Sequence, residues 1–197
     1  MKNILPLVLL LLPVAPTAND YFGKDIITVP QPELFSICYD HSCTTVVTDS
    51  LSTDEWQLAT AVLRHPYQTP AGEREAIATA IAGMEEVVGR HTGTSSDIGG
   101  NLSGFGKPSQ MDCIDESTNT NTYLLMFERE GLLKYHTVVS RSTRFGLFVG
   151  MPHTTAVIQD NVTQQRYAVD SWFHDNGQSP YIEKLEVWKT GGGPGEG

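Results

Sequence analysis

The segment from residue 153 to residue 170 constrains the fold more than any other stretch of the chain. Two runs with strand propensity, residues 157–158 and 167–169, lie on either side of the turn-forming pair Asp160-Asn161. A turn between two such runs is typical of an antiparallel hairpin. The sequence therefore predicts a hairpin in this half of the chain.

One register of this hairpin sorts its side chains onto two consistent faces. If Gln159 lies across from Gln164, then His153 lies directly opposite Asp170, and directly opposed residues share a face. The other face then carries four core-type side chains: Ala156, Ile158, Tyr167 and Val169. A slip of one residue would move every side chain of one strand to the wrong face. The apolar pattern and a His–Asp pair therefore favour the same register.

Two helices are expected upstream of the hairpin. The first, about residues 52–65, begins with serine and glutamate at capping-box spacing and ends before Pro66. The second, about residues 69–92, begins with Thr-Pro, has apolar residues at helical spacing and ends at Gly93. Short strands are expected at residues 26–29 and 44–48. Helices and an antiparallel hairpin in one chain indicate an α+β fold.

A third predicted helix begins near Cys113 and ends at Gly131. The free N–H groups and dipole at a helix start lower the pKa of a thiol, whereas neighbouring carboxylates raise it. Asp112, Asp115 and Glu116 are such carboxylates, so a thiolate here requires an imidazolium nearby. With one, Cys113 is expected to alkylate at pH 6 faster than an ordinary thiol.

His153 and Asp170 are the expected partners of Cys113. A thiol nucleophile, an imidazole base and a carboxylate that orients the imidazole form a nucleophilic catalytic set. The alternative from spacing alone is a structural His–Asp pair beside a buried thiol. Three other histidines are weaker candidates: His91 on an apolar helix stripe, His136 in a strand, and His174 in a turn expected near the cleft. The neighbouring Trp172 and Phe173 are expected to pack in the core rather than to bind substrate.

The remaining cysteines, Cys38 and Cys43, enclose four residues and are expected to form a small disulfide loop. Cys113 is then an unpaired thiol. The alternative is a disulfide from Cys113 to Cys38 or Cys43, because sequence does not fix the pairing. Cys38, His41 and Cys43 are too few ligands for a closed metal site.

The N-terminus resembles a secretory leader. Lys2 precedes an apolar run at residues 4–15, which is too short to span a bilayer. We expect residues 1–18 to be a signal peptide, residues 19–190 a single domain, and residues 191–197 a flexible glycine-rich tail. The protein is then exported, periplasmic or secreted, with no membrane span in the mature chain.

The net charge of −10 argues against nucleic acid as a partner, because phosphate binding requires a basic surface. No cofactor motif is expected. The partner implied by a reactive thiol is a peptide, protein or amide substrate.

The segment 112–115, His153 opening a strand and Asp170 ending the next one together resemble the transglutaminase-like cysteine hydrolase superfamily, bacterial exported members most of all. That resemblance implies a papain-like core in which the helix bearing the cysteine packs against an antiparallel sheet bearing the histidine and aspartate. It also implies roles: Cys113 as nucleophile, His153 as general base and Asp170 as orienting group. The sequence departs from the family at Ser171, where many members have proline, and at Thr154 and Thr155, which replace bulkier residues.

Three functions follow from these residues. The leading hypothesis is cysteine-dependent acyl transfer on peptide or amide bonds, as a hydrolase or a transamidase. The alternative is a non-catalytic exported binding domain on the same fold. A third hypothesis uses Cys113, His153 and Asp170 as ligands of a metal in a hydrolase, since zinc accepts all three residue types.

Overall fold

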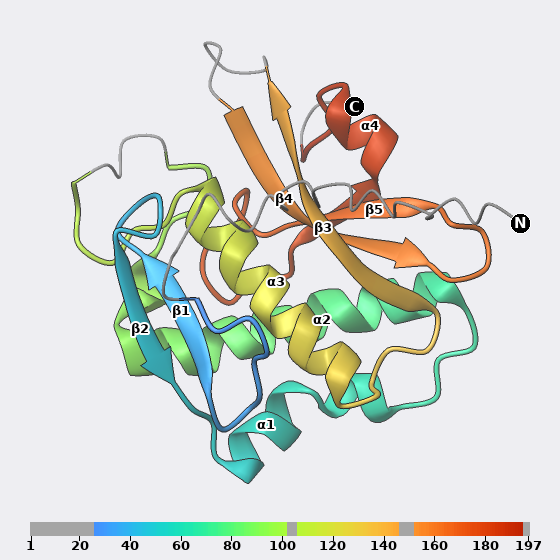
Figure 1. Cartoon of the computed structure of the whole chain (residues 1–197), viewed down its shortest axis with the longest axis horizontal. Helices are drawn as coiled ribbons and strands as arrows, with labels where there is room; N and C mark the ends of the chain where they lie inside the picture. The colour runs from blue at the N-terminus through green and yellow to red at the C-terminus, as the bar shows by residue number, and fades with distance from the viewer. Residues whose placement is uncertain (1–25, 102–105, 146–151, 195–197) are drawn as a thin grey trace, which may run out of the picture.

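The computed structural model describes residues 26–101, 106–145 and 152–194 (Figure 1). The expected signal peptide, residues 1–18, lies outside the described residues. The strands are β1 (Phe35–Tyr39), β2 (Thr45–Asp49), β3 (His136–Phe145), β4 (Pro152–Asp160), β5 (Arg166–Asp170) and β6 (Tyr181–Lys184). The helices are α1 (Thr53–Ala59), α2 (Pro70–Thr92), α3 (Cys113–Arg129) and α4 (Leu185–Lys189), with 3-10 turns η2 (Ala61–Arg64) and η3 (Thr94–Ser96).

The described residues form an α+β fold with two antiparallel sheets. β1 pairs with β2, and a four-stranded sheet has the order β3-β4-β5-β6. Figure 1 shows α3 running between the β1–β2 hairpin and the four-stranded sheet. Within the described residues, no helix is both long and apolar enough to cross a bilayer.

The main core lies between α3, α2 and one face of the four-stranded sheet. Leu124 and Phe127 of α3 pack there with Ile81 of α2 and with Ile158 and Val169 of the sheet. All five are fully buried, and full burial of each such side chain contributes roughly 1.5–3 kcal/mol. The core therefore fixes α3 firmly against the sheet.

A smaller cluster covers the other face of the same sheet. There α4 packs Leu185 and Trp188 against Val157 of β4 and Ala168 of β5. The sheet is thus covered on both faces where β4 and β5 adjoin, which explains why apolar side chains occupy consecutive positions there.

The predicted starts of α1 and α2 and the predicted end of α2 are confirmed, but α1 ends at Ala59, and the 3-10 turn η2 covers the rest of the predicted first helix. Ser52 and Glu55 form a capping box at the start of α1. Thr69 caps the start of α2 by accepting a hydrogen bond from the Gly72 N–H. The helix ends at Thr92, and its C-cap Gly93 has a φ of 83°, a left-handed conformation that favours glycine. Local capping chemistry therefore sets these helix limits.

The strand prediction is right at residues 45–48 and wrong at residues 26–29, which form no strand. The partner of β2 is instead β1, which sequence reasoning missed. Four of the five residues of β1 are buried, so β1 does not show the alternation expected of a strand with one exposed face.

The predicted hairpin is confirmed, but its register is wrong by two residues. Ile158 pairs with Tyr167 and Gln159 pairs with Arg166, not Gln164. Because successive side chains alternate between faces, a shift of two keeps every side chain on its predicted face. His153 therefore remains on the same face as Asp170 although it does not lie directly opposite it.

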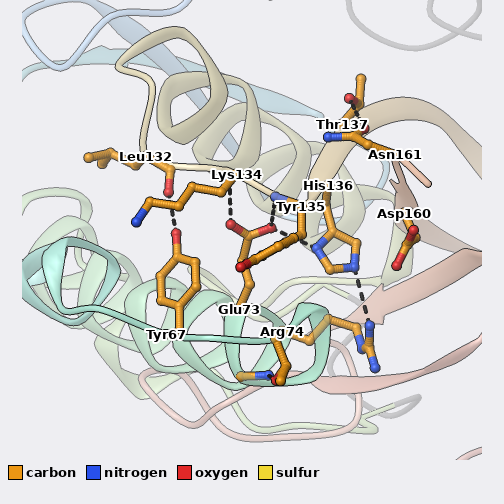
Figure 2. Close-up of polar contacts among 12 residues, drawn as sticks. Tyr67, Glu73, Arg74, Leu132, Lys134, Tyr135, His136, Thr137, Asp160 and Asn161 are labelled. Atoms are coloured by element: carbon orange, nitrogen blue, oxygen red, sulfur yellow. Dashed lines mark hydrogen bonds and ion pairs between the residues drawn. The ribbon is translucent and has the colours of Figure 1, made fainter. Parts of the chain in front are cut away.

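A buried Glu–His pair joins the start of α2 to the start of β3 (Figure 2). Figure 2 shows the Glu73 carboxylate pointing at the turn that precedes β3, where it accepts hydrogen bonds from the N–H groups of Lys134, at 2.5 Å, and Tyr135, at 2.8 Å. It also pairs with His136 Nδ1 at 2.8 Å. Arg74 Nη1 lies 3.3 Å from His136 Nε2, so the Nδ1 proton is the one shared with Glu73. Burial raises the pKa of Glu73, but these hydrogen bonds outweigh it and hold the pKa below its ordinary value.

Glu73→Gln should therefore destabilise the protein by about 3 kcal/mol, because it leaves buried donors without their charged acceptor. Urea unfolding at pH 7 measures this, with the exposed Glu75→Gln of the same helix as control. Because folding lowers the pKa of Glu73, its carboxylate stabilises the folded protein fully above pH 4.5. The difference in stability between the parent and Glu73→Gln should therefore shrink as the pH falls below 4.5. Equal stability of the two variants at pH 7 would contradict the assignment.

Candidate functional site

Cys113 is the first residue of α3. Asp112 caps the helix by accepting the N–H groups of Ile114 and Asp115, and Asp115 completes a reciprocal capping box. The backbone N–H of Cys113 lies at this helix start and acts on the residue's own thiol, whose pKa it lowers. Cys113 is half-buried and free of disulfide bonds. The helix start therefore presents a free thiol together with a backbone donor next to it.

His153 and Asp170 form a direct pair. His153 Nε2 lies 2.7 Å from Asp170 Oδ2, and the aspartate side chain is only 2 % exposed. His153 is the second residue of β4 and Asp170 is the last residue of β5. The shifted register makes them diagonal neighbours, which long side chains bridge easily. The bond to Nε2 leaves Nδ1 as the ring nitrogen that can exchange a proton with another group.

Trp188 adds a contact that sequence reasoning missed. Its indole Nε1 donates to Asp170 Oδ2 at 2.7 Å, so one carboxylate oxygen accepts from both Trp188 and His153. The Arg144 guanidinium stacks on the Trp188 ring, 4.4 Å from its centroid, and donates to the Trp188 carbonyl. No periodicity marks Trp188, because it reaches the site from a helix of only five residues.

Aromatic rings surround the His153 imidazole. The ring centroids of Trp172, Phe173 and Trp188 lie 4.9, 5.4 and 5.6 Å from that of His153. Phe173 continues the cluster to Tyr181 at 6.5 Å. These rings limit the positions open to the imidazole, which is a requirement for a directed base.

Cys113 reaches β4 beside His153. Its Sγ lies 3.8 Å from the carbonyl oxygen of Pro152, the residue before His153. The hydrogen bonds of the described residues include none between the thiol and the His153 ring. The structure thus joins His153 to Asp170 directly and brings the thiol to the neighbouring residue of the same strand.

The thiol is not stabilised as a thiolate. Burial raises the pKa of Cys113 to about 11; the charges of Asp112 and Asp170 add to the increase, and a hydrogen bond from the Thr154 backbone opposes it. The expectation of a lowered thiol pKa is therefore wrong for this structure. Desolvation and two carboxylates outweigh the helix start.

Glu85, Asp97 and Glu116 form a buried acidic cluster next to the first turn of α3. Burial raises the pKa of Glu85 to about 8 and that of Asp97 to about 6. Glu116, one turn after Cys113, has its pKa raised by burial and by the charges of Glu85 and Asp97. Asp97 accepts the Met111 N–H at 2.7 Å, and Glu85 accepts the Gly177 N–H at 3.0 Å. The cluster thus joins the segments before Cys113 and after Asp170.

The cysteine pairing is confirmed as Cys38–Cys43. Among the described residues, the group with metal-ligand spacing is Cys38, Cys43 and Asp115. It includes none of Cys113, His153 and Asp170, and both of its sulfurs belong to the disulfide. The metal-dependent hypothesis therefore has no ligand set here.

The other predicted histidines lie elsewhere. His91 is exposed, not buried, and its ring contacts the carboxylates of Asp49 and Glu55. His136 is buried at the start of β3, as expected of a strand residue. His174 follows Trp172 and Phe173 in the turn after β5.

The first residues of the predicted C-terminal tail pack on α4. The Gly191 N–H donates to the Trp188 carbonyl, and the Gly192 N–H donates to the Val187 carbonyl.

Comparisons with protein-family models, with curated proteins and with solved structures found no match. The function is therefore inferred from the geometry of Cys113, His153 and Asp170.

The raised pKa predicts a slow thiol. At pH 7, Cys113 should alkylate with iodoacetamide roughly 100-fold or more slowly than an ordinary thiol of pKa about 8.5, because far less of it is thiolate. Its rate should still be rising at pH 10, since the pKa is about 11. Site-resolved mass spectrometry of protein labelled between pH 6 and pH 10 measures both. A rate that is already maximal at pH 6 would indicate a thiolate–imidazolium pair and contradict this prediction.

Proposed function

We propose that the protein is an exported cysteine-dependent acyl-transfer enzyme of the transglutaminase-like type, acting on peptide or amide bonds. The observation that carries the proposal is the His153–Asp170 pair, at 2.7 Å, on the strand that Cys113 contacts through Pro152. A histidine oriented by a buried carboxylate beside a free thiol at a helix start is the arrangement that nucleophilic catalysis requires.

In the proposed first step, His153 Nδ1 takes the proton from Cys113 Sγ as the sulfur attacks the substrate carbonyl carbon. Asp170 balances the imidazolium that forms, and it holds Nε2 so that Nδ1 is the basic nitrogen. A thiol whose pKa is about 11 needs such a base, because almost none of it is ionised at neutral pH. The backbone N–H of Cys113 at the helix start then serves as a donor for the oxyanion of the tetrahedral intermediate.

In the second step the imidazolium gives its proton to the leaving amine, and a Cys113 thioester remains. Attack by water on the thioester completes hydrolysis, whereas attack by another amine completes transamidation. Both outcomes use the same three residues and regenerate the free thiol. The proposal therefore defines the acyl-enzyme and leaves the acceptor as either water or an amine.

Two observations support an exported setting for this chemistry. The Cys38–Cys43 disulfide is typical of oxidising compartments. The N-terminal apolar run after Lys2 has the length and charge of a secretory leader. The proposed substrates are accordingly peptides, proteins or amides outside the cytoplasm.

Acylation by 4-nitrophenyl acetate at pH 7.5 tests the proposal. The protein should release a burst of nitrophenolate and carry one acetyl group on Cys113. His153→Ala should slow this acylation about 10²–10⁴-fold, which is the usual contribution of a general base. His174→Ala, in the turn after β5, is the matched control and should acylate at the parental rate.

Two results would overturn the proposal. Acetylation of Cys113 no faster than that of the same thiol in urea-unfolded protein would favour the non-catalytic binding domain. An equal loss of rate in His153→Ala and His174→Ala would remove His153 from the role of base. Cys113→Ser separates acylation of the thiol from acetylation of lysines.

A further inference from the structure

The residues between the paired cysteines adopt an uncommon backbone. Asp40, His41, Ser42 and Cys43 all have positive φ, at 66°, 66°, 55° and 52°. Side chains of L-residues disfavour this left-handed conformation, and four in succession occur only when the surroundings impose it. The Cys38–Cys43 bond closes the ring that contains them. We call residues 38–43 the disulfide loop.

The left-handed turn points its amides at the start of α3. The His41 N–H donates to Asp115 Oδ2 at 2.8 Å, and the Cys43 N–H donates to Asp115 Oδ1 at 2.6 Å. The Ser42 N–H donates to Asp112 Oδ2 at 3.0 Å. Asp112 and Asp115 are also the two partners of the α3 capping box, on either side of Cys113. Three consecutive amides of the disulfide loop therefore hold the carboxylates that begin the nucleophile helix.

The disulfide loop also holds the chain before and after that turn of α3. Asn119, farther along α3, accepts the Cys38 N–H at 2.9 Å and donates to the Cys38 carbonyl at 2.8 Å. Asp40 accepts the Ser109 N–H at 2.8 Å. The loop thus contacts the segment from residue 109 to residue 119 at both ends and in the middle.

We propose that the Cys38–Cys43 disulfide is a redox-sensitive clamp that positions Cys113 for acyl transfer. The proposal rests on the function proposed above, since it names the regulation of the same thiol. A dithiol reductant breaks the Sγ–Sγ bond; its own two thiols are oxidised to a disulfide, and Cys38 and Cys43 each gain one electron and one proton.

Reduction removes the constraint that keeps residues 40–43 left-handed. The turn then relaxes toward ordinary backbone conformations, and its amides leave the carboxylates of Asp112 and Asp115. Two carboxylates then remain next to each other at the helix start, held only by the capping bonds within α3 itself. Repulsion between them loosens the first turn of α3 and displaces Cys113 from β4, so acylation slows although the core of the protein stays folded.

The test uses the full chain in oxidised and reduced forms, with the reductant removed anaerobically before assay. Reduction should speed hydrogen exchange of the Ile114 and Asp115 amides about tenfold or more, because their capping bonds open more often. Acetylation of Cys113 by 4-nitrophenyl acetate, read by site-resolved mass spectrometry, should slow by about tenfold. Reoxidation with glutathione disulfide should restore both, which irreversible damage to the protein would not allow.

Two variants make the result specific. The double substitution Cys38→Ser with Cys43→Ser should match the reduced parent and should not respond to dithiol. Ile77→Val, which removes one methylene from the buried face of α2, should change neither Ile114 exchange nor its response to reductant. These variants separate loss of the clamp from a general loss of stability.

The outcomes distinguish this proposal from the one it rests on. Unchanged exchange at Ile114 and Asp115 after reduction overturns the clamp, and so does faster exchange with an unchanged acetylation rate. If the oxidised parent does not acetylate Cys113 faster than unfolded protein does, the proposed function fails. The exchange measurement alone then decides whether the disulfide holds the start of α3.

Discussion

The fold depends on the buried carboxylate of Asp115, which is fully enclosed where the β1–β2 hairpin meets α3. Burial and the charge of Asp112 raise the pKa of Asp115 to about 7. The N–H groups of Cys43, Asp112 and His41 oppose this increase by stabilising the ionised form. A buried carboxylate without its donors costs several kcal/mol. The hairpin and the helix therefore cannot separate without a large loss of stability, and the position of Cys113 follows from this contact.

The same balance between burial and charge sets the chemistry of the thiol. The backbone N–H groups of Cys113 and Thr154 favour the thiolate of Cys113, but burial and the carboxylates of Asp112 and Asp170 keep the thiol protonated. Such a thiol is protected from adventitious alkylation and requires a base to react. Trp188 and the surrounding rings contact the His153–Asp170 pair and restrict the orientation of the His153 ring, which is the proposed base.

Local signals predicted much of this structure, and long-range contacts account for the rest. Capping residues predicted the starts of α1 and α2 and the end of α2, because they act on backbone groups three or four residues away. Side-chain alternation predicted the faces of His153 and Asp170 but not their register, since a shift of two residues leaves the pattern unchanged. Trp188 was missed because its bond to Asp170 joins residues from separate elements. Asp112 and Asp115 were treated only as nearby charges because the amides that bind them lie about 70 residues earlier.

The central claim is that Cys113, His153 and Asp170 act as one unit, and Asp170→Asn tests it most directly. An asparagine oxygen can still accept from both His153 and Trp188, so the fold should keep its unfolding temperature to within a few degrees. The missing charge no longer balances the imidazolium, so Cys113 acetylation should fall at least tenfold; the same change in a serine-protease triad costs about 10⁴. An unchanged acetylation rate in a folded Asp170→Asn protein would contradict the account.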